Sequence, residues 1–157
     1  ENDRLELAKE LLKEAEIHGT TIHLPEDSVL GDQFAQNAKV DLSSSYQIPD
    51  QWMGLDIGPR AIGKYSGLIR EAKTIFWNGP MGVFEFEAFS NGTKAIAEAV
   101  AQTTDQGAYS LIGGGDSVAA INSFNLGNRV SFMSTGGGAM LKLLEGSELP
   151  GIAAVKN

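Results

Sequence analysis

The sequence contains no cysteine, and this absence excludes a disulfide framework and any metal site with cysteine ligands. Basic residues are also few. Twelve Lys and Arg stand against twenty Asp and Glu, which gives a formal net charge of −8 at pH 7. Because affinity for a nucleic-acid backbone comes mostly from Lys and Arg, we expect no nucleic-acid partner.

Long apolar runs are missing as well. No uninterrupted apolar run is long enough to cross a bilayer, and no hydrophobic region typical of a signal peptide follows the charged first residues. We therefore expect a soluble, cytoplasmic protein with no membrane partner. The 157 residues suit a single domain over positions 1–157 with a substantial core.

Several enzyme signatures are missing too. The sequence has no G-x-S-x-G elbow and no Ser–His–acid order that would support nucleophilic hydrolysis. The dinucleotide fingerprint G-x-G-x-x-G also fails, because Val118 and Leu141 stand where its third glycine would be. These absences exclude the commonest hydrolase and dinucleotide-binding patterns.

Residues 58–64 have the G-x-x-x-x-G-K spacing of a phosphate-binding P-loop. However, Tyr65 follows where the P-loop needs the Ser or Thr hydroxyl that binds Mg²⁺, and Pro59 removes a backbone donor. Pro is favoured in the first turn of a helix. We interpret this stretch as a helix that carries an exposed Lys64.

Glycine, by contrast, is abundant: the nineteen glycines cluster at the ends of apolar runs. A strand, a glycine loop and a helix start recur around residues 54–59, 78–82, 113–117 and 135–138. Such alternation predicts an α/β fold, a Rossmann-like three-layer αβα arrangement with a mainly parallel sheet. The loops after parallel strands lie along one sheet edge, so we expect all four to converge on one crevice.

The patterns also predict individual elements. Asp3 has the spacing of a capping box for an amphipathic helix with one buried face, which Gly19 ends. Strands are expected at residues 20–24, 29–30, 39–42, 52–57, 74–77, 108–112 and 130–133, and further helices at 59–73, from 90 onward, after 117 and up to Gly146.

The loop at residues 113–117, GGGDS, carries the clearest chemistry. Glycines allow close approach of a phosphate, and the N–H groups of the following helical turn point at it. Asp116 would repel a phosphate unless a divalent cation lies between them, so we predict a Mg²⁺-nucleotide phosphate site.

Two other polar residues leave alternatives open: Glu85 could accept hydrogen bonds from ribose hydroxyls or be a solvated carboxylate, and His23 is best interpreted as an ordinary strand histidine.

Four segments together resemble the phosphoglycerate kinase family. Residues 77–85 (WNGPMGVFE) resemble its WNGPxGVFE motif, residues 113–117 (GGGDS) its GGGDT, residues 134–139 (STGGGA) its STGGGAS, and residues 54–59 its GLDIGP. The resemblance implies two Rossmann-like lobes, of which this chain is the latter part of the C-terminal, nucleotide-binding lobe. It also implies Mg²⁺-dependent phosphoryl transfer from 1,3-bisphosphoglycerate to ADP, giving 3-phosphoglycerate and ATP in glycolysis, by a monomeric parent.

The resemblance implies roles for matching positions. Gly54 and Leu55 would flank the adenine, with Pro80 and Val83 on the nucleotide side of the next loop. Asn78 would contact the phosphates and Glu85 the ribose. The phosphates would also be held by Gly114, Gly115, Asp116 and Ser117, with Asp116 on Mg²⁺, and the transferred phosphoryl group would face Gly136, Gly137 and Gly138.

Two positions depart from the family pattern: Ser117 replaces Thr and keeps the hydroxyl, whereas Met140 replaces Ser and removes one. The N-terminal lobe that binds the phosphoglycerate, and the family's catalytic Lys, are not in this chain. We therefore expect the isolated chain to bind nucleotide weakly or not at all and to be inactive. A nucleotide-binding module without catalysis, or a structural domain whose glycines only form turns, remain the alternatives.

Overall fold

The structure is a computed structural model that describes the backbone of residues 2–155. The chain forms α1 (Leu5–Ile17), β1 (Ser28–Gly31), β2 (Val40–Ser43), β3 (Met53–Ile57), α2 (Pro59–Glu71), β4 (Thr74–Asn78), α3 (Asn91–Asp105), β5 (Tyr109–Gly113), α4 (Gly115–Ser123), β6 (Phe132–Ser134), α5 (Gly137–Leu144) and α6 (Pro150–Ala153). Short 3₁₀ turns occur at Asn2–Arg4, Glu87–Phe89 and Gly127–Arg129. Most expected elements are present; α6 was not expected.

The strands form two sheets. Strands β4, β5 and β6 pair in parallel in the order β4-β5-β6, with α3 and α4 as the crossover helices. This parallel sheet flanked by helices confirms the Rossmann-like αβα class. Strands β1, β2 and β3 instead form an antiparallel sheet in the order β2-β1-β3, which the patterns did not predict. No helix separates these three strands, so their short connections suit antiparallel pairing.

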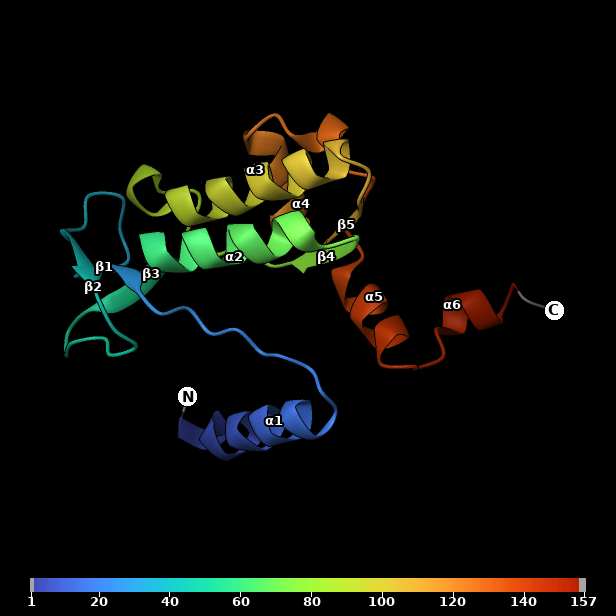
Figure 1. The fold of residues 1–157 in the computed structure, drawn as a ribbon, viewed down its shortest axis with the longest axis horizontal. Helices are drawn as coiled ribbons and strands as arrows, with labels where there is room; N and C mark the ends of the chain where they lie inside the picture. Colours follow the sequence, from blue (N-terminus) through green and yellow to red (C-terminus); the bar gives the residue numbers. More distant parts are fainter. Residues whose placement is uncertain (1, 156–157) are drawn as a thin grey trace.

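The core lies between the parallel sheet and the helices α2, α3 and α4, of which α2 and α3 run side by side in Figure 1. In α3, the apolar residues recur on more than one face, and most of them are buried. The core consists of Ile57, Ala61, Ile75, Trp77, Ile96, Ala97, Val100, Ala101, Ile112, Ile121 and Leu126. This packing fixes where β4 and β5 end, and thus where their glycine loops begin.

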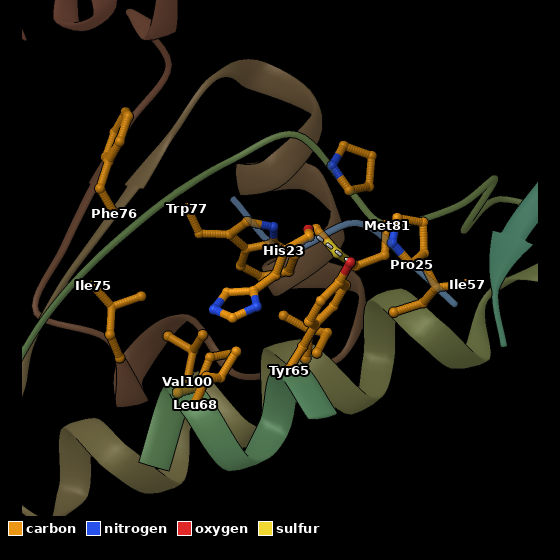
Figure 2. Close-up of a pocket in the computed structure, with 13 residues that line it drawn as sticks. His23, Pro25, Ile57, Tyr65, Leu68, Ile75, Phe76, Trp77, Met81 and Val100 are labelled. Atoms are coloured by element: carbon orange, nitrogen blue, oxygen red, sulfur yellow. Dashed lines mark hydrogen bonds between the residues drawn. The ribbon is translucent and has the colours of Figure 1, made fainter. Parts of the chain in front are cut away.

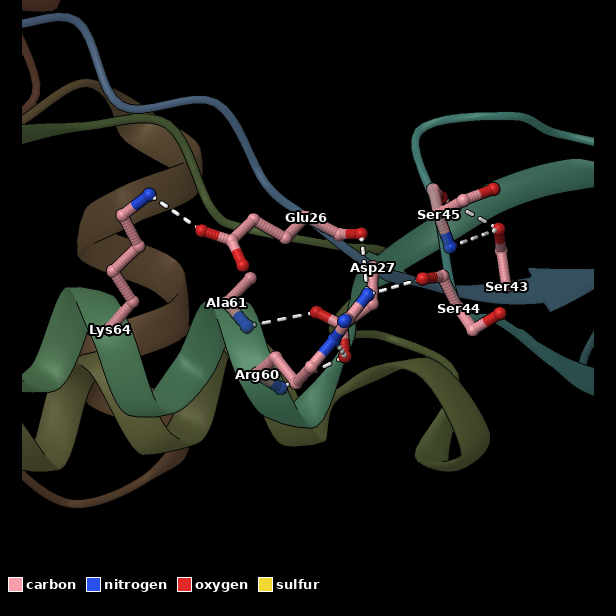
Figure 3. Close-up of polar contacts among 8 residues, drawn as sticks. All are labelled: Glu26, Asp27, Ser43, Ser44, Ser45, Arg60, Ala61 and Lys64. Carbon is pink, nitrogen blue, oxygen red and sulfur yellow. Dashed lines mark hydrogen bonds and ion pairs between the residues drawn. The ribbon is translucent and has the colours of Figure 1, made fainter.

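Two buried aspartates from outside the helices cap α2 and α3. The residues at the helix starts, Gly58 and Ser90, make no side-chain cap bond. Asp27 accepts hydrogen bonds from the N–H groups of Arg60 and Ala61 at 2.9 and 2.8 Å (Figure 3). Asp56 accepts one from Gly92 at 2.6 Å. A carboxylate at this place accepts hydrogen bonds from N–H groups that have no partner within the helix, and it interacts favourably with the positive end of the helix dipole.

Polar contacts around Asp27 also fasten the segment before β1 to α2. Arg60 donates to the carbonyl of Glu26 at 3.0 Å and to that of Ser44, and Lys64 pairs with Glu26 at 2.7 Å (Figure 3). This ion pair lowers the pKa of Glu26 and raises that of Lys64. Lys64 thus lies inside α2 on an exposed face, which confirms that residues 58–64 are no P-loop.

The N-terminal expectations were partly wrong. Helix α1 forms, but none of its residues is buried, because it lies apart from the rest of the fold in Figure 1. Its capping box is also not formed: the helix starts after Arg4, without a side-chain cap bond. Residues 20–24 form no strand, since no described strand pairs with them. Gly19, at φ +68°, does end the helix as expected.

Candidate functional site

Three of the four glycine loops meet at one edge of the parallel sheet. The ends of the three strands lie in register, with Asn78 of β4 beside Gly113 of β5, and Gly113 beside Ser134 of β6. The backbone N–H of Gly114 donates to the carbonyl of Ser134 at 2.9 Å. The expected convergence is therefore confirmed for the loops after β4, β5 and β6. The loop after β3 starts from the other sheet.

The contacts between these loops are close enough to require glycine. A Cβ added to Gly137 would lie 2.7 Å from the Cα of Gly114 and 3.1 Å from Oδ1 of Asn78. A Cβ on Gly114, whose φ is +90°, would lie 2.6 Å from the same Asn78 oxygen. Glycine is the residue that fits both the positive φ and the close approach. Asn78, Gly114 and Gly137 thus form one compact cluster.

Two helices begin at this cluster. Helix α4 starts at Gly115 and α5 at Gly137, and neither has a side-chain cap bond. No atom lies within 4 Å of where a Cβ would be on Gly115 or Gly138, so these positions face open space. Backbone N–H groups in the first turn of a helix are free donors with a favourable dipole for anions. The arrangement can hold an anion with more than one phosphate.

Among the predicted residues here, Asp116 and Ser117 differ in exposure. Asp116 is exposed in the first turn of α4. Ser117 is fully buried, and its Oγ accepts a hydrogen bond from the N–H of Gly79 at 2.6 Å. The Ser117 hydroxyl therefore joins α4 to the loop after β4. Within residues 2–155, no group of three or more His, Asp or Glu could hold a metal ion. Asp116 is the acidic residue in the first turn of α4.

A cleft of about 310 Å³ lies between the end of β3 and the loop after β4. Its lining includes four predicted nucleotide residues, namely Gly54, Leu55, Pro80 and Val83. The N–H of Val83 donates to the carbonyl of Leu55 at 2.9 Å, which joins the two walls. The loop after β3 thus meets the loop after β4 here, although it belongs to another sheet. Glu85 lies beyond the cleft lining and is exposed.

Asp56 lies in the wall of this cleft and is only 5% exposed. Burial raises the pKa of its carboxyl to about 6, although hydrogen bonds from the N–H groups of Gly92 and Ile57 oppose the rise. A Cβ on Gly82 or Gly92 would lie within 2.3 Å of its Oδ1, so both glycines make room for the carboxylate. Asp56 was not predicted as a site residue, although an acidic residue within an apolar strand was a signal for it.

Thr93 was also missed. It is fully buried in the first turn of α3, and its Oγ1 accepts hydrogen bonds from the N–H groups of Met81 and Gly82, each at 3.1 Å. No local pattern could have found this contact, since it joins residues 11 and 12 positions apart through the folded loop.

A larger hollow of about 500 Å³ adjoins the cleft beside β4 and α2, and it shares Pro25, Ile57, Pro80 and Met81 with the cleft (Figure 2). Its lining is almost wholly apolar, and Pro80 is the one predicted site residue in it. His23 lies at this hollow, where its carbonyl accepts a hydrogen bond from the Tyr65 hydroxyl at 3.0 Å (Figure 2). The glycine cluster and its helix starts are not part of it. Polar donors are needed to bind a phosphate, so the smaller cleft and the glycine edge are the better candidate site.

Comparison with known proteins decides the family. A profile of the phosphoglycerate kinase family matches residues 1–147. The chain belongs to the phosphoglycerate kinase family. It is 51% identical over 156 residues to phosphoglycerate kinase of Porphyromonas gingivalis, covering 99% of this chain and 37% of that protein. With the Thermosynechococcus vestitus enzyme it shares 52% identity over 155 residues, covering 99% of this chain and 39% of that protein.

Solved structures agree. Phosphoglycerate kinase from Coxiella burnetii matches with a TM-score of 0.89 and 42% identity, over 98% of this chain and 39% of that one. The Pyrococcus horikoshii enzyme matches with a TM-score of 0.81 and 34% identity, over 98% of this chain and 36% of that one. The chain thus spans about two fifths of the length of the curated relatives it matches. Among residues 2–155, no helix combines the length and apolar character needed to cross a membrane.

Proposed function

We propose that this chain supplies the nucleotide and Mg²⁺ side of a phosphoglycerate kinase. The reaction transfers a phosphoryl group from the acyl phosphate of 1,3-bisphosphoglycerate to ADP and yields 3-phosphoglycerate and ATP, a step of glycolysis. Residues 1–157 would form the latter part of the C-terminal, nucleotide-binding lobe. Family membership supports this reaction, because the motif residues lie in the matched region.

The observation that carries the proposal is the cluster of Asn78, Gly114 and Gly137 at one sheet edge. It places the starts of α4 and α5 side by side, where their free N–H groups can bind a chain of phosphates. A structural turn would not need three glycine loops in contact at the same edge. Phosphoryl transfer depends mostly on positioning and on stabilising negative charge, and the free N–H groups at the two helix starts would contribute to both.

The nucleotide roles follow from the two parts of the site. The adenine would lie in the cleft against Leu55 and Val83, with Gly54 and Pro80 beside it. The ribose would extend toward Glu85, whose exposed carboxylate can accept from hydroxyls.

The phosphates would then reach the glycine edge. Asn78, Gly114, Gly115 and Ser117 would hold them, with Ser117 acting through its backbone N–H, since its hydroxyl already contacts Gly79. Gly136, Gly137 and Gly138 would offer donors at the start of α5 to the phosphoryl group in transfer.

The site fits a Mg²⁺ ion bound through the nucleotide. Mg²⁺ is commonly held by one or two carboxylates together with substrate phosphates and waters, and Asp116 is an exposed carboxylate in the first turn of α4. Asp116 could then lie close to the phosphates, because a bound cation would screen the repulsion between its carboxylate and the phosphate charge. The residues of this chain would orient the nucleotide around the ion.

The isolated chain would not catalyse. None of the segments 78–82, 113–117 and 134–138 contains Lys or Arg, so a cationic clamp for the transferred group is missing from the loops. Such a clamp changes rates by about 10³-fold or more in phosphoryl transfer. The 1,3-bisphosphoglycerate and 3-phosphoglycerate would bind to the other lobe of the parent enzyme, which we expect to be monomeric and cytoplasmic.

A chimera tests the proposal. In it, this chain replaces the matching segment of the Porphyromonas gingivalis enzyme, to which it is 51% identical. Calorimetry with Mg-ADP and a coupled assay of ATP formation would be run on the chimera and on the chain alone. We expect binding and turnover by the chimera, and neither turnover nor tight binding by the chain.

The outcomes separate the alternatives. A folded chimera that does not bind Mg-ADP would favour a structural module, whereas binding without ATP formation would favour a nucleotide-binding module. For the metal role, Asp116→Ala in the chimera is expected to reduce ATP formation at least about a hundredfold, while Glu98→Gln on the exposed face of α3 is the matched control. Unchanged turnover by Asp116→Ala would refute the role of Asp116.

A further inference from the structure

In residues 79–83, the first part of the loop after β4, every backbone N–H has an identified partner from outside the loop. The N–H of Gly79 donates to Ser117 Oγ and that of Val83 to the carbonyl of Leu55. Pro80 has no N–H. The remaining donors, those of Met81 and Gly82, both bind Thr93 Oγ1 at 3.1 Å. Thr93 therefore accepts both hydrogen bonds from the middle of this loop.

The geometry suits a single hydroxyl with two acceptor lone pairs. Thr93 is fully buried and lies in the first turn of α3, a rigid element of the core. The loop cannot readily shift toward Asp56, because Gly82 already sits so close that a Cβ there would lie 2.3 Å from Asp56 Oδ1. The loop thus has one well-defined position, set by its hydrogen bonds to Thr93 of α3 and by the close approach of Gly82 to Asp56.

This position matters for the cleft, since Pro80, Met81, Gly82 and Val83 all line it. We propose that Thr93, which does not itself line the cleft, is a positioning residue that sets the affinity for the purine end of the nucleotide. The inference rests on the proposed function, because it assigns the cleft to the purine. Without the hydroxyl, two N–H groups lose their partner, and the loop gains other conformations in which Pro80 and Val83 no longer face the ligand together.

Thr93→Val in the chimera tests the inference, because Val keeps the shape and removes the acceptor. We expect the Kd for Mg-ADP, and the KM for ADP, to rise about tenfold, while kcat changes less than about twofold. Thr93→Ser restores the acceptor and is expected to recover the original KM. The matched control is Thr103→Val on the same helix, since the buried Thr103 hydroxyl donates to the helix's own Ala99 carbonyl at 2.8 Å.

Two probes locate the effect. Adenosine is expected to lose affinity by the same factor as Mg-ADP, whereas Mg-pyrophosphate is expected to bind equally to both proteins. Equal loss of pyrophosphate affinity would overturn the assignment to the purine end. If Thr93→Val does not fold, Thr93→Cys, with a weaker acceptor, is expected to show an intermediate rise in Kd.

The possible failures are distinct. A folded, unsubstituted chimera that does not bind Mg-ADP contradicts the proposed function. A chimera that binds Mg-ADP, and whose Thr93→Val or Thr93→Cys variant binds it equally well, contradicts the role of Thr93 alone. A rise in KM for Thr103→Val equal to that for Thr93→Val would also overturn it, because the effect would then be a general weakening of α3.

Discussion

Replacing the buried Asp56 by Asn should change how the stability of the chain depends on pH. The carboxyl is 5% exposed, and burial raises its pKa from 3.8 to about 6. The structure shows no ion pair to Asp56 among the described residues; its partners are the N–H groups of Gly92 and Ile57, at 2.6 and 2.9 Å. The charged form is therefore less favourable in the folded chain than in the unfolded one.

The size and sign of the effect on stability follow from the linkage between proton binding and folding. A pKa raised from 3.8 to about 6 corresponds to about 3 kcal/mol of free energy of unfolding. This contribution is fully present below the unfolded pKa, because the folded chain binds the proton more tightly, and it is lost as the pH rises through about 6. At neutral pH the carboxylate thus lowers the stability of the fold.

Asn removes the charge but offers one acceptor oxygen to two donors, a loss of about 1–2 kcal/mol. We therefore expect Asp56→Asn to be about 1–2 kcal/mol more stable than the original chain near neutral pH. This advantage should shrink by about 2.5 kcal/mol between roughly pH 7 and pH 4, so that the variant is no longer the more stable protein in acid.

Urea unfolding, followed by tryptophan fluorescence at a series of pH values, measures the difference between the two proteins. A ¹³C-carboxyl NMR titration identifies the Asp56 resonance by its loss in the variant and gives its midpoint directly. Asp50→Asn, at an exposed position, provides the baseline. A stability difference that does not vary with pH, or an Asp56 midpoint near 4, would refute the reasoning.

Three further predictions concern other contacts. Asp27→Ala leaves the first donors of α2 without a partner and is expected to lower the free energy of unfolding by about 2–3 kcal/mol, measured by urea unfolding. Gly114→Ala is expected to raise the Kd of the chimera for Mg-ADP more than about tenfold in calorimetry, because of its φ of +90° and the contact with Asn78; unchanged affinity would contradict the close packing of the loops. Lys64→Met should leave ATP formation by the chimera unchanged, since Lys64 only pairs with Glu26 on the surface, and a large loss would revive a P-loop role.

Much of the parallel sheet and its loops could be predicted from the sequence. Apolar runs followed by glycines located β4 and β5 and their loops, because burial and positive φ impose local residue requirements. The same patterns predicted that the glycine loops converge, since parallel strands end at one edge, and this is confirmed for the loops after β4, β5 and β6.

The rest depended on contacts that no local pattern records. Residues 20–24 alternate like a strand, yet no described strand pairs with them, and α1 has an apolar face, yet none of its residues is buried. Strand β3 resembles the other strands locally but pairs in an antiparallel sheet. Asp27 and Thr93 accept hydrogen bonds from residues 33 and 12 positions away in the sequence, so only the folded chain brings them to their partners.

The two aspartate caps bind the helices to the antiparallel sheet. Asp27 directly precedes β1 and Asp56 lies within β3, whereas α2 and α3 cover the parallel sheet. The first turn of each helix is therefore complete only when β1 and β3 are in place. We expect the two sheets to open as one cooperative unit, so that the amides of Ala61 and Gly92 exchange with solvent hydrogen at the rate of the amides in β1 and β3.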